Sequence, residues 1–531
     1  MEGVVTSGLF SQLVKLCFYL LALRGLVVYT YRWLISPLSH IPGPFPAKFS
    51  DWYGAYYSAL GSLHLRTLEA HERYGSVVRI GPNKISFNTI SALHTIYSAR
   101  TLQKTEGYVA MLPSPRVYNV HNVIDKDVHR FKRKIINQGL SEQRMRDFEP
   151  AMNNQIDIFI QNIRRACKES EDEWSEPINM TTPCKYLGYD IMGQFGFGQS
   201  FQLQIKPDNR FLVESINLSA ILLGVYFQFA DLVKARLHVV FASRALKLRK
   251  ELQALMERIV SERVTAEKHS QHDLFSFVID AKDPESGRGF SFTELWAEGR
   301  LLLIAGSDTS STTITSLFFY LSRYPECYKK LASEIRGSFD HASDIHSSMQ
   351  MVECIYLRAC IDETLRMSPP VGGTMWRKAC PGSGGIVIDG QCIPEGVELG
   401  CSAYALHHNE EYFPDSFTFK PERWIVSTDT SKESVDLARR AFAPFSLGTR
   451  GCAGRTMAYM ETSNVIAKTI WYFDFTVAGG HFGTIGEGSS DGPEGRKRMK
   501  EFQLEDHFTS THEGPYLQFK LRKEVADQLP R

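Results

Sequence analysis

The sequence FSLGTRGCAG, residues 445–454, decides how the fold of this chain is interpreted. Its cysteine, Cys452, lies between glycines and just before a run of apolar residues with helical spacing, which predicts a helix that starts there. The N-terminus of a helix lowers the pKa of a nearby cysteine, so we expect Cys452 to favour the thiolate that binds metals. Gly448 and Gly451 are predicted to adopt backbone angles that other residues avoid, and Gly454 to leave room for a flat group. The alternative is a buried structural cysteine in a glycine-rich turn.

Length and composition indicate one large catalytic domain behind an N-terminal segment. The chain has 531 residues, and no linker-like break appears before residue 478. The formal net charge of +1 gives no reason to expect nucleic acid or an acidic substrate as a partner. The ten cysteines include no CxxC or CxxCH motif, so a zinc ribbon, a thioredoxin-like motif and c-type haem attachment are unsupported. We expect free thiols in a reducing compartment.

The N-terminal segment is apolar enough to insert into a membrane. Leu9–Ile35 is rich in apolar residues and is interrupted by Lys15 and Arg24. Arg24 near the centre costs about 2.5–3.5 kcal/mol, whereas the ten Leu, Val and Phe residues around it return about 3–6 kcal/mol. Spanning a bilayer is therefore feasible, and a helix lying in the interface is the alternative. Prolines at 37, 42 and 44 then break the helix.

Two basic residues one helical turn apart follow in the first third of the chain. His129 and Arg133 stand at i and i+4, so a helix places both side chains on one face. Taken alone, the pair fits a solvated basic surface.

A long helix is predicted between Ser291 and Tyr324. Ser291 and Glu294 form a capping box, and the apolar periodicity continues for about 32 residues, or ~48 Å. The middle of this helix reads AGSDTS, residues 305–310, where hydroxyl groups compete for backbone carbonyls and weaken the helix. Such a weak point indicates that something must fit there, although a Ser/Thr-rich buried helix is the alternative.

Two further motifs lie between the long helix and the cysteine loop. Glu363 and Arg366 are three residues apart in a helical run, so they face the same way. The sequence PERW, residues 421–424, supplies a second arginine, Arg423. A Glu-x-x-Arg motif alone is common on charged helices, but its order before PERW and the cysteine loop is a specific signal.

Taken in this order, the motifs resemble those of the cytochrome P-450 family over nearly the whole chain, and no essential motif is missing. The resemblance implies a mainly α fold with small β-sheets, in which an α-rich triangular domain and a β-rich lobe follow an N-terminal membrane anchor. It implies the limits 1–36 for the anchor, 37–50 for a proline-rich hinge and 51–531 for the catalytic domain.

The resemblance also implies the groups that bind the cofactor. Cys452 would be the axial ligand of haem b, iron protoporphyrin IX, and Phe445 would pack beside the thiolate. Four basic residues would hold the haem carboxylates or neighbour an anion beside the thiolate: His129, Arg133, Arg377 and Arg450.

Two groups of polar residues would serve catalysis and stability. Asp308 and Thr309 would relay protons during oxygen activation, and the small residues Ala305 and Gly306 would leave room for dioxygen and substrate. A buried triad of ion pairs would be structural and not catalytic: Glu363, Arg366 and Arg423.

The implied function is a monooxygenase in the endoplasmic reticulum membrane, with a single-pass anchor and a cytosolic catalytic domain. It would use dioxygen, and electrons from NADPH through a separate NADPH-cytochrome reductase, because no flavin or dinucleotide fingerprint is present. The run SPPVGGTMWR, residues 368–377, resembles filamentous-fungal secondary-metabolite members, so the expected substrate is a small hydrophobic metabolite. Residues 211–230 would form a roof over its pocket or simply a buried helix.

Two alternatives to hydroxylation stay open at this point. The same site could desaturate, rearrange or ring-expand its substrate, because the pocket decides the outcome. From another class, the chain could be a membrane haem-binding sensor without turnover.

Overall fold

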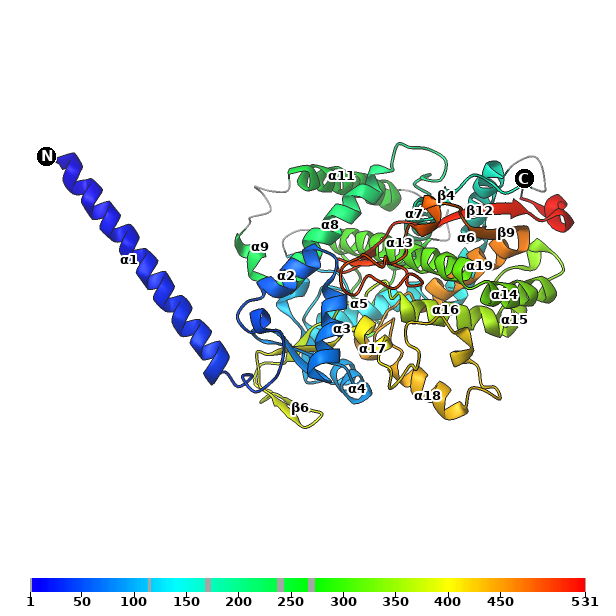
Figure 1. Cartoon of the computed structure of the whole chain (residues 1–531). Coiled ribbons are helices and arrows are strands. Elements are labelled where there is room, and N and C mark those ends of the chain that lie inside the picture. The colour runs from blue at the N-terminus through cyan, green and yellow to red at the C-terminus, as the bar shows by residue number, and fades with distance from the viewer. Residues whose placement is uncertain (1, 113–115, 168–172, 236–242, 266–272, 531) are drawn as a thin grey trace.

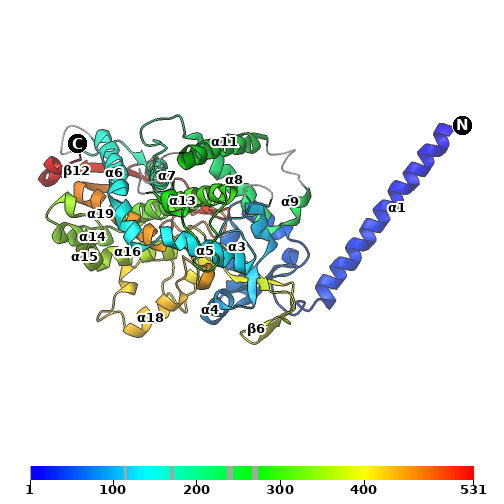
Figure 2. The same cartoon turned by 180° about the vertical axis from the view of Figure 1, so that it is seen from behind.

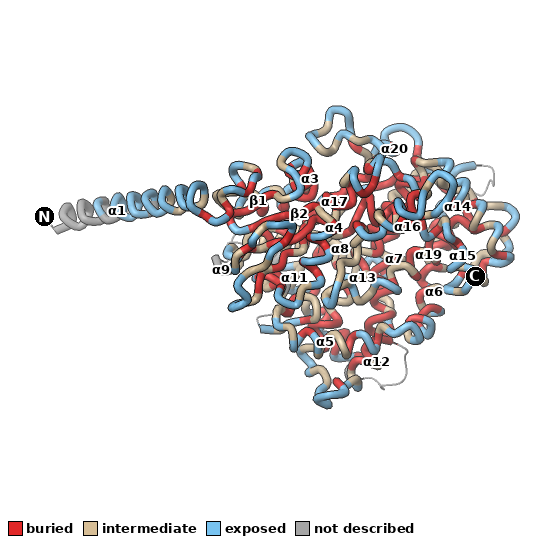
Figure 3. Tube along the Cα trace, turned by 90° about the horizontal axis from the view of Figure 1, so that it is seen from below, coloured by how far each residue is buried: buried red, intermediate tan, exposed pale blue. Residues whose placement is uncertain are grey.

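The computed structural model describes residues 2–112, 116–167, 173–235, 243–265 and 273–530. The described chain is mainly helical with small sheets, as predicted, and helix α1 (Glu2–Thr30) stands apart from a body that contains the other elements (Figures 1 and 2). Buried residues run through this body, whereas none of the described side chains of α1 is buried (Figure 3). The helices of the body are α2 (Trp52–Ala59), α3 (Leu63–Tyr74), α4 (Ile90–Ser98), α5 (Lys126–Gly139), α6 (Glu142–Ala166), α7 (Thr181–Phe197), α8 (Phe211–Gln228), α9 (Asp231–Ala235), α11 (Ser243–Thr265), α12 (Leu274–Val278), α13 (Phe292–Arg323), α14 (Pro325–Ser338), α15 (Met349–Glu353), α16 (Ile355–Met367), α17 (Ala403–His407), α18 (Lys432–Ala441), α19 (Arg455–Tyr472) and α20 (His481–Thr484).

Two described helices are long and apolar enough to cross a membrane. The first, Val14–Ile35, has 22 residues and a mean hydropathy of 1.4, and none of it is buried. It is the candidate membrane anchor, and it ends before Pro37, as the prolines predict. The second, Phe211–Gln228, has a mean hydropathy of 1.5 and is 39% buried, because it packs on the body as α8.

The proline-rich segment after α1 is tied to the first strand. Backbone N–H of Arg79 donates to the carbonyl of Pro42 at 2.8 Å, and the buried Arg79 guanidinium donates to the carbonyl of Leu38 at 3.2 Å. A Cβ at Gly43 would lie 2.1 Å from the Arg79 carbonyl oxygen, so no side chain fits there. These contacts fix where the chain enters the body.

Helix α13 crosses the body and contacts α7, α16 and α19 (Figure 1). The predicted capping box of Ser291 and Glu294 is present, and the helix runs for 32 residues. The predicted weak point does not break it, because its hydroxyls donate to carbonyls one turn back. Thr309 Oγ1, for example, lies 2.7 Å from the Ala305 oxygen.

The largest sheet lies beside the N-terminal helices and has the order β1-β2-β8-β5-β3. Its strands are β1 (Val77–Gly81), β2 (Lys84–Phe87), β8 (Glu398–Cys401), β5 (Arg377–Ala379) and β3 (Leu102–Lys104). The register sets Lys104 opposite Arg377, which brings two cations to one edge of the sheet. The strand β6 (Ile386–Ile388) pairs with β7 (Gln391–Ile393), and β8 joins the larger sheet.

Smaller sheets bring the C-terminal chain back onto the helices. The strand near the C-terminus, β12 (Tyr516–Leu521), pairs with β9 (Phe473–Val477) and with β4 (Ile178–Asn179). A short pair, β10 (Glu505–Asp506) and β11 (Ser510–Thr511), precedes it. Residues 508 and 509, between the two short strands, reach the central cavity.

The predicted ion-pair triad lies in the buried core. Both Arg366 Nε and Arg423 Nε lie 2.9 Å from carboxylate oxygens of Glu363, which is fully buried. Trp424 Nε1 and the backbone N–H of Lys420 also donate to this carboxylate, at 3.0 Å each. Burial alone would raise the pKa of Glu363, but the charges of the two arginines outweigh it and hold the pKa below its usual value.

Candidate functional site

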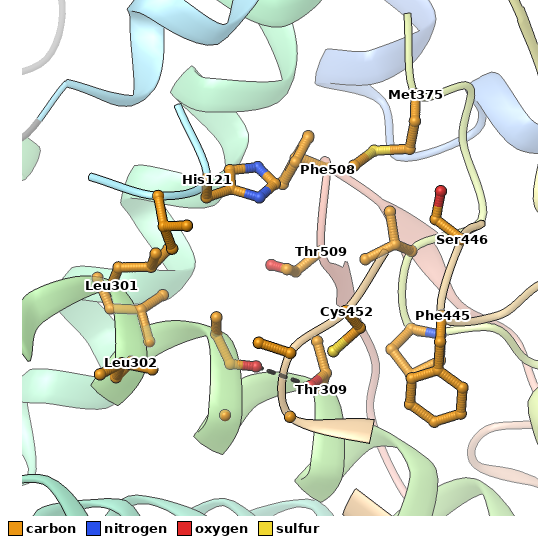
Figure 4. Close-up of a pocket in the computed structure, with 18 of the residues that line it drawn as sticks. His121, Leu301, Leu302, Thr309, Met375, Phe445, Ser446, Cys452, Phe508 and Thr509 are labelled. Atoms are coloured by element: carbon orange, nitrogen blue, oxygen red, sulfur yellow. Dashed lines mark hydrogen bonds between the residues drawn. The ribbon is translucent and has the colours of Figure 1, made fainter. Parts of the chain in front are cut away.

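A cavity of about 1040 Å³ lies at the centre of the body, between α13 and the cysteine loop (Figure 4). The thiol of Cys452 faces into it, and Thr309 of α13 lies across from the thiol (Figure 4). Leu301 and Leu302 line the side of the cavity away from Phe445 (Figure 4). Residues more than a hundred positions apart in the sequence therefore meet at one site.

The cysteine loop is held by its own backbone. The Cys452 N–H donates to the Phe445 carbonyl at 2.9 Å, and the Gly451 N–H donates to the Gly448 carbonyl at 3.1 Å. Gly448 has φ +69°, and a Cβ there would lie 2.2 Å from the Tyr97 carbonyl oxygen, so glycine is required as predicted. Gly451 is different: its φ of −61° suits any residue, so the prediction of an unusual backbone angle was wrong there.

The prediction that the helix N-terminus lowers the pKa of Cys452 is also wrong for the protein without a bound ligand. Helix α19 begins at Arg455, three residues after the cysteine. Burial raises the pKa of the thiol above its usual value, and the Gly454 N–H and the charges of Arg133 and Arg455 offset this only in part. A further positive charge, such as that of a bound metal ion, would favour the thiolate at this position.

Six basic residues gather on one side of the cavity, and we call them the basic cluster. Five of them line the cavity wall, and Arg377 completes the group behind them. The members are Lys104, His121, His129, Arg133, Arg377 and Arg450. Among the described residues, no carboxylate lies within ion-pair distance of the lysine or of the three arginines.

Backbone carbonyls and one phenol hold the arginines of the basic cluster in place. Arg133 donates to the Gly451 carbonyl at 2.7 Å, and Arg450 donates to the Val123 carbonyl at 2.7 Å. Arg377 donates to the phenolic oxygen of Tyr108 at 3.0 Å. These neutral acceptors fix the side chains without cancelling their charge, so the cluster stays strongly positive.

The pKa values show how much positive charge is concentrated there. Burial and the charges of three neighbouring arginines lower the pKa of Lys104 well below its usual value. Burial together with the surrounding cations lowers the pKa of His129 to about 3 and that of Arg450 to about 10. A bound dianion would relieve this repulsion, and two carboxylates of one ligand would supply it.

The two residues expected to relay protons are not on the same face of α13. Thr309 lines the cavity, but Asp308 is buried and is absent from its walls. Asp308 Oδ1 lies 3.9 Å from Nζ of Lys185 on α7. Burial raises the pKa of nearby Tyr189 well above its usual value, and the charge of Asp308 raises it further. The carboxylate therefore lies behind the helix as seen from the thiol.

Gly306 of α13 allows close packing against α7 and also leaves space in the cavity. Gly306 lines the cavity, yet a Cβ on it would lie 2.5 Å from the sulfur of Met192 on α7. The expectation that Gly306 simply leaves room for a ligand is thus incomplete, because the neighbouring helix needs the same space.

Comparison with known proteins gives the family. The model of the family described as cytochrome P-450 matches residues 45–489. The chain belongs to the cytochrome P-450 family. It is 37% identical to the cytochrome P-450 monooxygenase AKT7 of Alternaria alternata over 92% of this chain and 94% of that protein. It is 34% identical to the monooxygenase apf7 of Gibberella fujikuroi over 94% of this chain and 96% of that protein, and 33% identical to poxM of Penicillium oxalicum over 97% and 96%.

Membership makes the chain a haem-thiolate monooxygenase, an oxidoreductase with a haem-iron cofactor. It confirms the predicted resemblance to fungal secondary-metabolite members. Dioxygen, a substrate and a redox partner follow from the same chemistry. A sensor without turnover is therefore not supported.

The cavity of this cytochrome P-450 fits the cofactor on three structural grounds. The thiol of Cys452 faces the cavity, and the basic cluster matches the two carboxylates of haem. At Gly454, which also lines the cavity, a Cβ would meet open space. The first two grounds were predicted from Cys452, His129, Arg133 and Arg377, whereas the roles of Lys104 and His121 were not.

A buried acid in the cavity wall was also missed. Glu461 of α19 is fully buried and lines the cavity, and among the described residues neither of its carboxylate oxygens has a hydrogen-bond partner of good geometry. Burial raises its pKa to about 8, although the hydroxyl of Ser310 lowers it somewhat. The carboxyl group is therefore mostly protonated and neutral at pH 7.

Glu461 predicts a pH-dependent stability. Its pKa of about 8 in the folded state lies above the usual 4.5, so the folded state holds a proton that the unfolded state releases between those values. Wild-type unfolding free energy should fall relative to Glu461→Gln by about 1.4 kcal/mol per pH unit across this range. Urea unfolding of the holoprotein at pH 5 to 8.5 measures the difference. Ser310→Ala, which removes the hydroxyl that lowers this pKa, should extend the fall to higher pH. Parallel curves for wild type and Glu461→Gln would contradict the assignment.

Proposed function

We propose that Cys452 is the axial thiolate ligand of the haem iron and that this chain oxidises a small hydrophobic metabolite. The observation that supports this most is the position of the Cys452 thiol, which faces a large cavity between Thr309 and the basic cluster. When bound, the haem would supply the redox chemistry that activates dioxygen.

The basic cluster would hold the two haem carboxylates. Arg133, Arg377 and His129 were predicted for this role, and we add Lys104 because it stands opposite Arg377 in the sheet and lines the cavity. At neutral pH His129 is uncharged in the protein alone, and two incoming carboxylates would favour its protonated form. Arg450, held by the carbonyls of residues 123 and 124, would add positive charge beside the thiolate.

Phe445 would shield the sulfur. Its ring packs against Tyr459 at 5.3 Å between ring centres, and its carbonyl accepts the hydrogen bond from the Cys452 N–H. This arrangement limits water near the thiolate, and water and hydrogen bonds at the ligand tune the redox potential of the metal.

Thr309 would hold and pass the proton that oxygen activation consumes. Its hydroxyl faces the cavity and can both donate and accept a hydrogen bond. Asp308 is proposed as its proton source. Because the carboxylate lies behind α13, transfer to Thr309 needs a bridging water or a change in the Asp308 side-chain rotamer.

The membrane and electron-transfer assignments are part of the same proposal. The exposed, apolar α1 supports an anchor over residues 1–36, a hinge over 37–50 and a catalytic domain over 51–531. We propose a single-pass anchor in the endoplasmic reticulum membrane, a cytosolic catalytic domain and electrons from an NADPH-cytochrome reductase. Hydroxylation is the proposed reaction, with desaturation, rearrangement or ring expansion as alternatives that the same site permits.

Replacing Thr309 tests the catalytic part. General acid–base groups contribute about 10²–10⁴-fold to rate, so Thr309→Ala should lower product formation at least about tenfold while NADPH consumption continues and peroxide is released. Thr312→Ala is the matched control, because Thr312 donates to the Asp308 carbonyl at 2.8 Å and lies outside the cavity wall. Product and peroxide are measured per NADPH with a reconstituted reductase. Unchanged coupling in Thr309→Ala would contradict the assignment.

A further inference from the structure

A buried acid on α13 contacts a loop that lines the cavity, and the proposed reaction does not use this acid. Glu298 is 1% exposed and does not itself line the cavity. Its Oε2 accepts a hydrogen bond from the backbone N–H of Val120 at 3.0 Å. Residues 119–121 line the cavity, and we call residues 119–122 the cavity loop. Glu298 therefore ties this part of the cavity wall to the long helix from behind.

The cavity loop is a tight turn that is held by its own side chains. Oδ1 of Asn119 accepts hydrogen bonds from the backbone N–H groups of residues 121 and 122, at 3.1 and 2.9 Å. Oδ1 of Asn122 accepts one from the Asn119 N–H at 2.8 Å. These bonds hold the four residues together, so the single bond from Val120 to Glu298 positions the whole loop.

The cavity loop brings two members of the basic cluster together. His121 lines the cavity beside Phe508, and the two ring centres are 5.8 Å apart (Figure 4). Its Nε2 atom is buried and has no hydrogen-bond partner among the described residues. Nζ of Lys104 donates to the backbone carbonyl of His121. A carboxylate that lies here would accept hydrogen bonds from both side chains.

A buried cation holds the carboxyl group of Glu298 in place. Nζ of Lys132 on α5 lies 3.2 Å from Oε1 of Glu298 and 3.1 Å from Oε1 of Glu294. Burial raises the pKa of Glu298 to about 7, and the charge of Lys132 and the Val120 N–H offset burial only in part. A carboxyl oxygen can accept the bond from Val120 in either protonation state. Since α5 also carries two members of the basic cluster, Lys132 links the cavity loop to that helix.

We infer that Glu298 is a positioning residue for the cofactor, which acts through the cavity loop to hold His121 and Lys104 toward the haem carboxylates. Glu298 lies outside the cavity wall, so it acts on these side chains and not on the haem itself. The inference rests on the proposed role of the basic cluster. Loss of the acceptor for a buried backbone N–H shifts an equilibrium about tenfold or more, so loss of Glu298 should loosen the loop and release haem faster.

Haem loss and hydrogen exchange of the purified holoprotein test this role. Haem loss is followed at pH 8 as transfer to excess apomyoglobin, and exchange of the backbone amides is followed by mass spectrometry. In Glu298→Ala, haem loss and amide exchange of residues 117–124 should both be at least about tenfold faster than in wild type. Glu298→Asp keeps the charge but is one methylene shorter, and it should raise both rates at least about threefold. Glu298→Gln keeps an oxygen for the Val120 N–H, so both rates should return to within about threefold of wild type.

Glu294→Gln is the matched control on the same helix. It removes the other carboxylate that pairs with Lys132, it keeps a side chain that can cap α13, and it leaves the Val120 hydrogen bond in place. Haem loss and exchange of residues 117–124 should therefore stay close to wild type. In a His121→Ala background, Glu298→Ala should speed haem loss less than it does alone, because part of its effect passes through His121.

Three results would overturn the inference. They are exchange of residues 117–124 in wild type as fast as that of the exposed residues 489–491, unchanged haem loss in both Glu298→Ala and Glu298→Asp, or equal effects of Glu298→Ala and Glu294→Gln. Failure of the proposed basic cluster is a different result. In that case Arg133→Gln, which neutralises a member of the cluster, would lose haem at the wild-type rate.

Discussion

Cys452→Ser should reduce product formation below detection while the protein stays folded. The thiolate is the ligand that donates electron density to the iron, and a serine hydroxyl at the same position is a much poorer donor at neutral pH. The basic cluster is untouched by the substitution, so we expect haem still to bind, with a different spectrum. Product formation and haem content per protein measure the two effects separately.

Cys401→Ala is the control for this result. Cys401 also lines the cavity and is buried, and burial raises the pKa of its thiol above the usual value. Replacing it should leave turnover within a few-fold of wild type. Substantial product from Cys452→Ser, or a loss of turnover in Cys401→Ala as large as that in Cys452→Ser, would contradict the assignment of the ligand.

Glu363→Ala should prevent folded protein from accumulating. The substitution leaves Arg366 and Arg423 buried without their carboxylate, and breaking a buried ion pair costs about 3–5 kcal/mol. It also removes the acceptor for Trp424 Nε1 and for one backbone N–H. Because whole proteins are stable by only about 5–15 kcal/mol, the loss is a large share of the total. Soluble yield and urea unfolding measure it.

Glu422→Ala is the comparison, since Glu422 lies in the same PERW segment but pairs with the exposed Lys330 at 2.6 Å. A pair near the surface contributes at most about 1 kcal/mol, so this variant should fold normally. Equal behaviour of Glu363→Ala and Glu422→Ala would show that the triad does not stabilise the core as proposed.

Features with a local chemical cause were predictable from the sequence. The capping box and the Tyr324-Pro325 boundary fix the ends of α13, and the positive φ of Gly448 follows from a crowded turn. The triad was predictable from the family resemblance, because the Glu-x-x-Arg motif, the PERW motif and the cysteine loop stand in the order that the family has. These cases depend on residues close together in the chain or on a motif with several specified positions.

Features that depend on distant packing were not predictable. Lys104 joins the basic cluster because strand pairing sets it opposite Arg377, and Glu461 is isolated because α19 buries it against Ser310 of α13. The prediction of a lowered pKa for Cys452 failed for a related reason, because the local effect of the helix end is smaller than the cost of burying a charge. Asp308 and Thr309 are adjacent in sequence, yet the helix turns them to different sides.

The most direct test of the central assignment is the absorption spectrum of the purified, reduced holoprotein exposed to carbon monoxide. A bond between the Cys452 sulfur and the haem iron predicts the strongly red-shifted Soret band of a thiolate-ligated haem in wild type and its absence in Cys452→Ser. A wild-type spectrum without that band, or a Cys452→Ser spectrum that keeps it, would contradict the account.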